Sequence, residues 1–305
     1  GVDDSQVKKA IVSQPQLLGL SLENNLKPTV QWLKGLGVDD SQVKKAIVSQ
    51  PQLLGLSLEN NLKPTVQWLK DLGMEDPQVA KVLTEFPQIL GYSLEDNVKP
   101  TVQFLKDLGI EDTQVAKVLA KRPQLFSLSL EENLQPTVQW LKDLGMEDPQ
   151  VAKVLTKFPH LLSLSVEENM KLSVQWLKDL GMVDSQVAGA LIMFPELLGL
   201  SLEDNLKPKA QILRRGGFSD SQLAKSLSSF PNLLGYSAQR LVHRMTTLDA
   251  QGSLTVASLL RAMPWTDGKF GERCAASSLV DDGCTMAETY LSSLGFSVAQ
   301  ILTVK

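Results

Sequence analysis

One pattern returns every 36 residues through most of this chain. The seventeen residues LGLSLENNLKPTVQWLK, which end at Lys34, occur again without change 36 residues later. Prolines keep the same interval from Pro15 to Pro231, and glycines keep it from Gly1 to Gly217. A fixed period of this length is typical of a solenoid, in which each unit covers the apolar face of its neighbour. We therefore number each copy from position 1, its glycine, to position 36.

The first half of each copy predicts a short amphipathic helix. An aspartate at position 4 is expected to cap it, because its side-chain oxygen can face the open amides of the first turn. Val79, Val82 and Leu83 have the i, i+3, i+4 spacing of one buried stripe, and Pro87 then ends the helix. The PQIL segment that follows is too short for a further full helix and predicts a single tight turn.

The second half of each copy predicts a longer helix. Ser129 and Glu132 have the S-x-x-E spacing in which the cap and the third residue satisfy each other's amides. The helix is expected to run to the glycine of the next copy. A proline at position 28 is expected to remove one backbone hydrogen bond and to bend the helix. Leu172 replaces this proline in the fifth copy, so the bend is not required for the repeats to stack.

Two helices and a turn per 36 residues predict an all-α fold, a right-handed α-solenoid of about eight repeats. Seven tandem repeats are expected over residues 1–252, and a degenerate C-terminal repeat with a cap over 253–305. The seventh copy is one residue shorter after Ser237, and YLSSLGFSVAQIL is expected to begin a ninth. Because the chain opens on a repeat without an initiator Met, we expect it to be the later part of a longer array.

Composition argues against several classes of protein. Apolar residues never run to the ~18 that a membrane span needs, so no membrane contact is expected. Cys274 and Cys284 are the only cysteines, too few for a disulfide scaffold, and neither has a histidine near enough for a zinc site. His160 and His243 have no partner at ligand spacing, and no glycine-rich phosphate loop occurs. We expect no enzyme, cofactor, metal or small-molecule substrate.

The segment FPQILGYSLEDNVKPTVQFLKDLG, with VAKVL and the recurring Pro-x-L-L, resembles the mitochondrial transcription termination factor (mTERF) repeat. The resemblance covers nearly the whole chain and implies a curved superhelix, each unit having two α-helices and a short 3₁₀ helix. It also implies a mitochondrial or chloroplast protein that binds double-stranded DNA or RNA through basic residues on its inner surface. The implied activities are transcription termination, transcript processing, splicing or ribosome function.

The net negative charge of the chain is unusual for a protein that binds nucleic acid. The net charge is −4, whereas nucleic-acid-binding domains are usually basic. The repeats over residues 1–216 hold 23 basic and 27 acidic side chains, and residues 217–305 hold seven of each. Binding therefore requires that the basic residues be segregated onto one surface.

The second helix offers the first candidate surface, because positions 27 and 34 share one flank beside its core stripe. Stacked repeats would place the cations at these positions in two parallel rows, which we predict as contacts to nucleic acid. These cations are Lys27, Lys63, Lys99, Lys171, Lys207, Lys34, Lys70, Lys106, Lys142, Lys178 and Arg214. The alternative is a solvated helix face, since a glutamate lies four residues before each position-27 lysine. The lysines at position 9 of the first helix have the same two interpretations, and there we favour the solvated face.

The seventh copy offers the second candidate surface. Its SAQRLVHRM segment loses the glutamate and introduces Arg240, His243 and Arg244, while Arg214 and Arg215 close the preceding helix. Arginine presents forked donors to phosphate, so this least neutralised cluster is predicted to make the stronger contact. In the alternative interpretation, the same arginines cap the end of the stack.

The tryptophans at position 32 border the core on the side away from the lysine flank. Trp32, Trp68, Trp140 and Trp176, with Phe104 as the variant, are therefore predicted to pack between repeats rather than to stack on bases.

These features together predict a non-catalytic, nucleic-acid-binding regulator of organellar gene expression. The alternative is a scaffold that binds protein partners in a larger assembly, such as an organellar ribosome. In a third interpretation the near-identical copies only add length.

Overall fold

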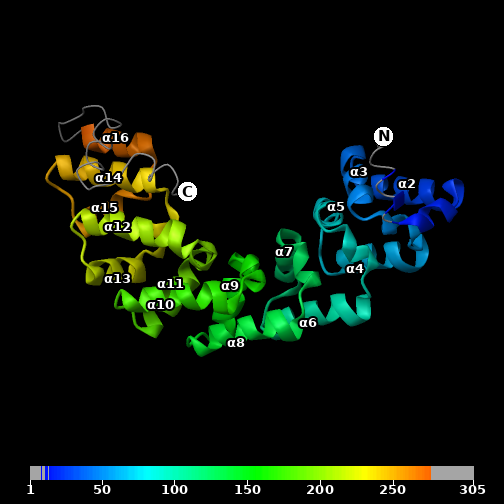
Figure 1. Ribbon diagram of the computed structural model, residues 1–305, viewed down its shortest axis with the longest axis horizontal. Coiled ribbons are helices and arrows are strands. Elements are labelled where there is room, and N and C mark those ends of the chain that lie inside the picture. The colour runs from blue at the N-terminus through cyan, green and yellow to red at the C-terminus, as the bar shows by residue number, and fades with distance from the viewer. Residues whose placement is uncertain (1–7, 9–10, 13, 276–305) are drawn as a thin grey trace. The chain divides into compact units, whose positions relative to one another are not determined.

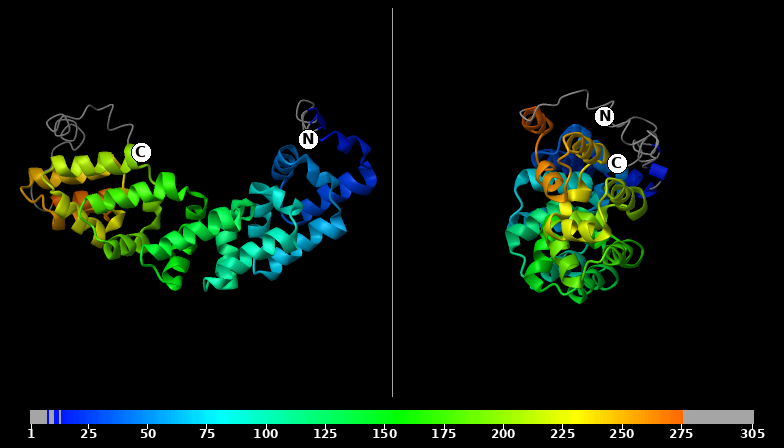
Figure 2. Two further views of the ribbon diagram at one scale, coloured as in Figure 1. Left: turned by 60° about the horizontal axis from the view of Figure 1, so that its bottom comes forward. Right: turned by 90° about the vertical axis from the view of Figure 1, so that its left-hand side faces the viewer.

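The computed structural model describes residues 8, 11–12 and 14–275, and in these ranges it contains helices and short connections without any strand (Figure 1, Figure 2). The all-α prediction is confirmed. The helices and tight turns recur about every 36 residues, as an α-solenoid requires. The expected ninth copy and Cys284 lie outside the described residues.

The first helices begin at position 4 as predicted, but the predicted cap is wrong. In the second copy position 3 holds the cap: Asp39 Oδ1 accepts a hydrogen bond from the Gln42 backbone N–H at 2.8 Å, and Gln42 Oε1 accepts one from the Asp39 N–H at 3.0 Å. Asp40 is then the first helical residue, where a negative charge suits the helix dipole. The first helices are α3 (Asp40–Ser49), α5 (Asp76–Glu85), α7 (Asp112–Lys121), α9 (Asp148–Lys157), α11 (Asp184–Met193) and α13 (Asp220–Ser229).

A 3₁₀ turn follows each first helix, which confirms the predicted tight turn. The residue before its proline is non-helical, with φ −138° and ψ 73° at Gln50, because the proline ring excludes the helical region for its predecessor. The turns are η1 (Pro15–Gly19), η3 (Pro51–Gly55), η5 (Pro87–Gly91), η7 (Pro123–Ser127), η9 (Pro159–Ser163), η11 (Pro195–Gly199) and η13 (Pro231–Gly235).

The second helix of each of the first six copies has two parts. Five residues of π-helix come first, in η2 (Leu22–Leu26), η4 (Leu58–Leu62), η6 (Leu94–Val98), η8 (Leu130–Leu134), η10 (Val166–Met170) and η12 (Leu202–Leu206). An α-helix continues directly in α2 (Lys27–Gly35), α4 (Lys63–Asp71), α6 (Lys99–Asp107), α8 (Gln135–Asp143), α10 (Lys171–Asp179) and α12 (Lys207–Arg215). The serine at position 21 caps this composite helix, as predicted, and Ser57 Oγ accepts from the Asn60 N–H at 3.1 Å.

The π-helical segments replace the simple proline bend that the sequence predicted. In the second copy the Leu62 N–H reaches back five residues to the Ser57 carbonyl, at 3.1 Å. A π-helical turn holds one more residue than an α-helical turn, so it inserts a residue without rotating the apolar stripe beyond it. The fifth copy has Leu172 in place of proline and still forms η10, so the proline does not cause the π-helix.

The seventh copy lacks the π-helical segment. Its second helix, α14 (Ala238–Ala250), is regular α-helix from the Ser237 cap onward. This is the copy that is one residue shorter after its serine. The missing residue is therefore the one that the π-helical turn accommodates elsewhere.

A glycine in the left-handed region ends each second helix. At Gly73 φ is 99°, and the Met74 N–H donates to the Leu69 carbonyl at 3.1 Å, the long bond of a Schellman motif. Gly252, where we predict that an eighth copy starts, has the same left-handed conformation, with φ 62°. That copy contains α15 (Val256–Ala262) and α16 (Asp267–Ala275).

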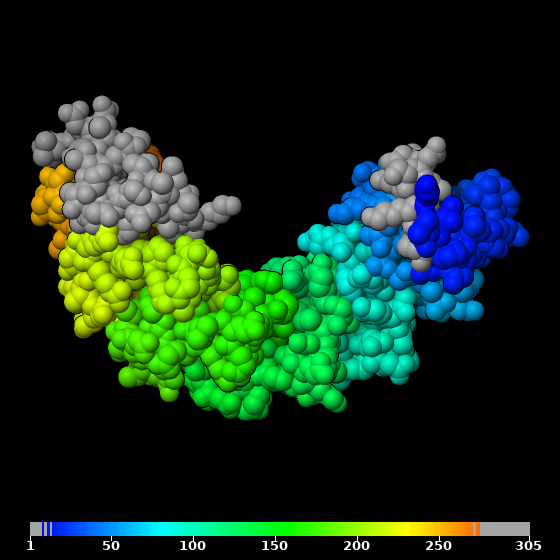
Figure 3. Space-filling model, viewed as in Figure 1, coloured from blue at the N-terminus to red at the C-terminus, as the bar shows by residue number. Residues whose placement is uncertain are grey.

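The chain divides into two compact units, residues 1–136 with 148–163, and residues 137–147 with 164–305. In the first unit α3, α5, α7 and α9 pack against one another in chain order, and in the second α11, α13 and α15 do the same. Second helices also pack on the first helix that follows them, as α4 does on α5 and α12 does on α13. Successive repeats accordingly form successive colour bands within each unit (Figure 3). Leu69 and Leu105 show the resulting core, because neither has any exposed surface.

Candidate nucleic-acid interface

The position-27 lysines pair with glutamates of their own helices. The pairs are Glu23–Lys27, Glu59–Lys63, Glu95–Lys99, Glu167–Lys171 and Glu203–Lys207. The lysine side chains keep 40–52% of their surface exposed, and exposed helical pairs of this kind contribute only about 0.3–0.5 kcal/mol. Locally the charge of each pair is zero. This geometry is what the solvated-face interpretation predicts, although each ammonium retains N–H groups for another acceptor.

The position-34 cations pair with the aspartate at position 4 of the next copy. The pairs are Lys34–Asp40, Lys70–Asp76, Lys106–Asp112, Lys178–Asp184 and Arg214–Asp220, the last four at 2.5–2.8 Å. The glycine turn brings the C-terminus of one helix to the N-terminus of the next. The cation then lies at the negative end of one helix dipole and the aspartate at the positive end of the other, and both placements are favourable. The hydrogen bond and charge of Lys34 hold the pKa of Asp40 below its ordinary value. Lys142 holds position 34 on α8, and Arg215 ends α12.

The lysines at position 9 differ from both of these sets. Lys45, Lys81, Lys117 and Lys153 lie on α3, α5, α7 and α9, the packed helices of the first unit, and all four are exposed. We call them the first-helix lysine row. Lys81 approaches Glu85 at 3.9 Å, whereas the other three form no ion pair with any residue in the described ranges. Positive charge is less neutralised here than at positions 27 and 34, although the sequence favoured a solvated face for these lysines.

Further lysines lie at the C-terminal ends of α7 and α9. Lys121 lies one turn beyond Lys117, and Lys157 lies one turn beyond Lys153. Neither helix has an acidic residue after its first turn. Cations suit the negative end of a helix dipole, so part of this charge has a stabilising role in the fold. Its exposure also leaves it accessible to an anionic ligand.

Within the arginine cluster of the seventh copy, Arg244 is buried and Arg240 is partly buried, with 29% of its side chain exposed. Arg244 has no exposed surface, and its Nη2 donates to Asp267 Oδ1 at 2.6 Å and to the Trp265 carbonyl at 3.2 Å. Its guanidinium lies 3.8 Å from the centre of the Phe270 ring. Arg240 Nη2 donates to the same Trp265 carbonyl at 2.5 Å. These contacts hold α16 against α14, which corresponds to the end-cap interpretation of the arginines.

Asp267 neutralises part of the charge of this cluster, because it lies 2.6 Å from Arg244 and 3.8 Å from Arg240 and the two guanidiniums share this one carboxylate. Burial and the charge of Arg244 lower the pKa of His243, so the imidazole is mostly neutral near pH 7. The sequence pattern could not show this pairing, since Asp267 follows Arg244 by 23 residues and α15 lies between them in the chain.

A series of buried polar side chains occupies position 29 of the second helices. Thr65 occupies this position in the second copy and donates its hydroxyl to the Asn61 carbonyl of its own helix at 2.9 Å. Lys209 replaces threonine in the sixth copy, is 1% exposed, and donates from Nζ to the Leu234 carbonyl of the next copy at 2.9 Å. Counted back from the glycine that ends its copy, Arg244 holds the same position. Two buried cations thus link the last copies to their successors.

The described residues contain no group of three or more His, Cys, Asp or Glu side chains placed to hold a metal ion. Among the helices that the structure describes, none combines the length and apolarity that a membrane crossing requires. The feature of the described surface that can bind a ligand is therefore its rows of lysines, some in ion pairs and some without them.

Comparison with known proteins identifies the repeat. The mTERF family model matches residues 1–271, which covers the seven tandem copies and most of the described eighth. No curated protein matches the chain at a significant level. The family match agrees with the observed pairs of helices separated by 3₁₀ turns. On this evidence the chain belongs to the mTERF family.

Proposed function

We propose that this chain is a non-catalytic regulator of organellar gene expression, which binds double-stranded DNA or RNA through the first-helix lysine row. Membership of the mTERF family supports nucleic-acid binding in a mitochondrion or chloroplast as the general activity. The observation that carries the proposal is the set of Lys45, Lys117 and Lys153, exposed on packed helices and without carboxylate partners among the described residues. Packed helices lie about 8–10 Å apart, so the row offers regularly spaced charges to a phosphate backbone.

The paired cations have a secondary role in this proposal. At positions 27 and 34 a phosphate must compete with a carboxylate that already accepts from the ammonium, so each contact there gains less. An unpaired lysine displaces only water and releases counterions from the nucleic acid, which is the main source of sequence-independent affinity. We therefore assign Lys27, Lys63 and Lys99, with their equivalents, to weaker peripheral contacts.

A charge-matched pair of variants tests the proposal. The first variant is Lys45→Gln, Lys117→Gln, Lys153→Gln, and the control is Lys27→Gln, Lys171→Gln, Lys207→Gln, which changes the net charge by the same amount. Affinity for duplex DNA and for structured RNA is measured by fluorescence anisotropy between about 50 and 200 mM salt. Each lost phosphate contact reduces the salt slope by about 0.9. We expect the first variant to lose two to three phosphate contacts, with about tenfold or more lower affinity. We expect the control to lose less than one contact.

The other outcomes are equally informative. Equal losses in both variants would assign the interface to the position-27 lysines or to overall charge, and would remove the first-helix row from the proposal. Absence of binding to either nucleic acid at low salt would reject nucleic-acid binding and favour the protein-binding scaffold, whose apolar contacts respond little to salt.

A further inference from the structure

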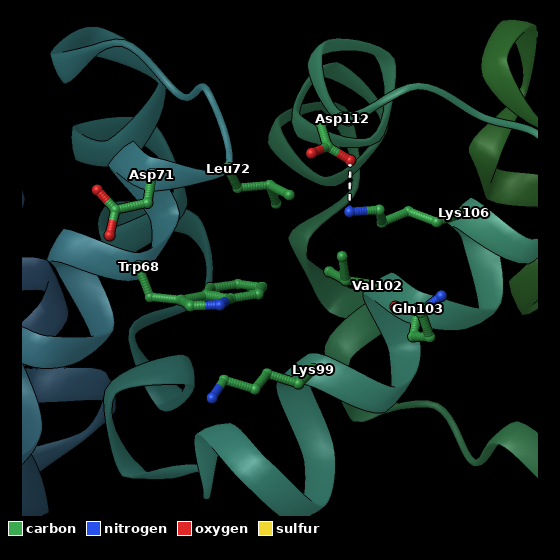
Figure 4. A pocket seen from close by; sticks show the side chains of 8 residues that line it. All are labelled: Trp68, Asp71, Leu72, Lys99, Val102, Gln103, Lys106 and Asp112. Carbon is green, nitrogen blue, oxygen red and sulfur yellow. Dashed lines mark ion pairs between the residues drawn. The ribbon is translucent and has the colours of Figure 1, made fainter.

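An open pocket of about 300 Å³ lies between the second and third copies, within the first unit (Figure 4). Trp68 of α4 projects its indole into this space, toward α6. Lys99 lies on one side of the ring, and the Lys106–Asp112 ion pair lies on the other. The volume is at the lower end of the range for small-ligand pockets, about 300–1,000 Å³.

Trp68 has unused binding capacity. Its side chain is half-buried, and its indole N–H donates to no residue that the structure describes. No other aromatic ring among the described residues contacts it. The sequence predicted packing between repeats for this residue, but part of the ring lines the open pocket. A planar ligand can therefore stack on the indole without displacing another aromatic group.

The polar groups around the ring are both donors and acceptors. Lys106 Nζ makes one contact, to Asp112 at 2.8 Å, which leaves two of its three N–H groups. Gln103 donates from Nε2 to Asp107 at 2.7 Å, so its Oε1 remains an acceptor toward the pocket. An aromatic platform with flanking cations and both kinds of hydrogen-bonding group suits a nucleobase and its phosphate better than an apolar side chain.

We propose that this pocket binds one unpaired nucleobase of a single-stranded nucleic acid, with the base on the Trp68 indole and a neighbouring phosphate on Lys99 or Lys106. The inference rests on the proposed function for its ligand class and adds recognition of unpaired segments to it. Bases in a duplex are stacked on each other and unavailable to the indole. The boundary between the first and second copies repeats the same residue types, with Trp32, Lys63 and Lys70.

The test compares a complete single-stranded oligoribonucleotide with an abasic oligonucleotide of the same length, which keeps the phosphates and lacks the bases. Trp68→Leu removes the stacking surface, whereas Trp68→Phe reproduces the residue that Phe104 provides naturally in the third copy. Loss of one stacked base weakens binding by about 5- to 150-fold. We expect Trp68→Leu to weaken binding of the complete strand within this range, Trp68→Phe to weaken it less, and neither to change binding of the abasic strand.

A second measurement protects the test against misfolding of the leucine variant. In a protein whose other four tryptophans are changed to phenylalanine, the fluorescence of Trp68 reports on its own pocket. The complete strand should quench it, and the abasic strand should not. Absence of quenching, or quenching by an aromatic peptide but not by the strand, would overturn the proposal. The first-helix variant lowers affinity for both strands alike, so failure of the base pocket and failure of the proposed function are distinguishable.

Discussion

Lys209 is the residue in which burial most changes chemistry. Its Nζ lies 2.9 Å from the Leu234 carbonyl, and the side chain is 1% exposed. Burial lowers the pKa of its ammonium to about 8, because the charged form loses its hydration. The ordinary lysine pKa is about 10.4, so the unfolded state binds more protons than the folded state between about pH 8 and pH 10.4. The contribution of Lys209 to stability therefore increases with pH through this window and is smallest below pH 8.

Lys209→Met tests this linkage. Methionine keeps an unbranched chain in the same space and has no charge to desolvate, so the variant should lose the rise in stability between pH 8 and pH 10.4. The difference amounts to at most about 3 kcal/mol. Urea unfolding at pH 7 and pH 10 measures it, with the exposed Lys63→Met as the control that keeps the rise. An unchanged rise in Lys209→Met would show that another group is responsible.

The π-helical segment is the element that adjusts the length of the second helix. It lies between the serine cap and the α-helical part, where η4 precedes α4, and the one-residue-shorter seventh copy forms α14 without it. Counted back from the closing glycine, Leu206 and Leu241 are equivalent, and both are fully buried. The residue difference is therefore absorbed before the apolar stripe, so that the core keeps its register.

Two single-residue deletions in the second copy test this view. Deletion of Asn60 lies inside η4, and we expect it to convert the segment to regular α-helix, as in α14, with a stability change of about 1 kcal/mol or less. Deletion of Gln67, an equally exposed residue of α4, rotates Leu69 and Leu72 by about 100° away from the core. We expect this control to lose several kcal/mol. Thermal melts followed by circular dichroism compare the two, and equal damage would contradict the length-adjusting role.

At the scale of the whole chain, the stability of each copy depends on its contacts with the adjacent copies. Within each unit, first helices pack on first helices of adjacent copies, and second helices such as α4 pack on the first helix that follows. In such an array each copy contacts mainly its neighbours, so a local lesion is expected to affect its own copy and the next one. The seventh and eighth copies are joined at α14 and α16 by Arg240, Arg244 and Asp267, so this end provides a defined local lesion.

Asp267→Asn should open the C-terminal end alone. The substitution leaves the buried Arg244 guanidinium without its carboxylate, which costs on the order of 1–3 kcal/mol. We expect faster amide hydrogen exchange in α14 and α16, measured by mass spectrometry, with α3 to α7 unchanged. Exchange that increases through both units would show that the copies unfold as one cooperative block.

The sequence by itself determined the period, the helical class, the 3₁₀ turn and the glycine that ends each copy. These features follow from backbone preferences of proline, glycine and capping serine, which act within a few residues and are written the same way in every copy. It also located the exposed lysines. Right-handedness of the solenoid and the division into residues 1–252 and 253–305 stay predictions.

Only the tertiary structure decided which cations are free. Lys106 meets Asp112 because a left-handed glycine turns the chain between them, and Arg244 meets Asp267 because α16 folds back on α14. A helical wheel represents one helix at a time, so it shows neither Asp112 beside Lys106 nor Asp267 beside Arg244. Charge neutralisation depends on distances between elements, and these distances are set by how the helices pack.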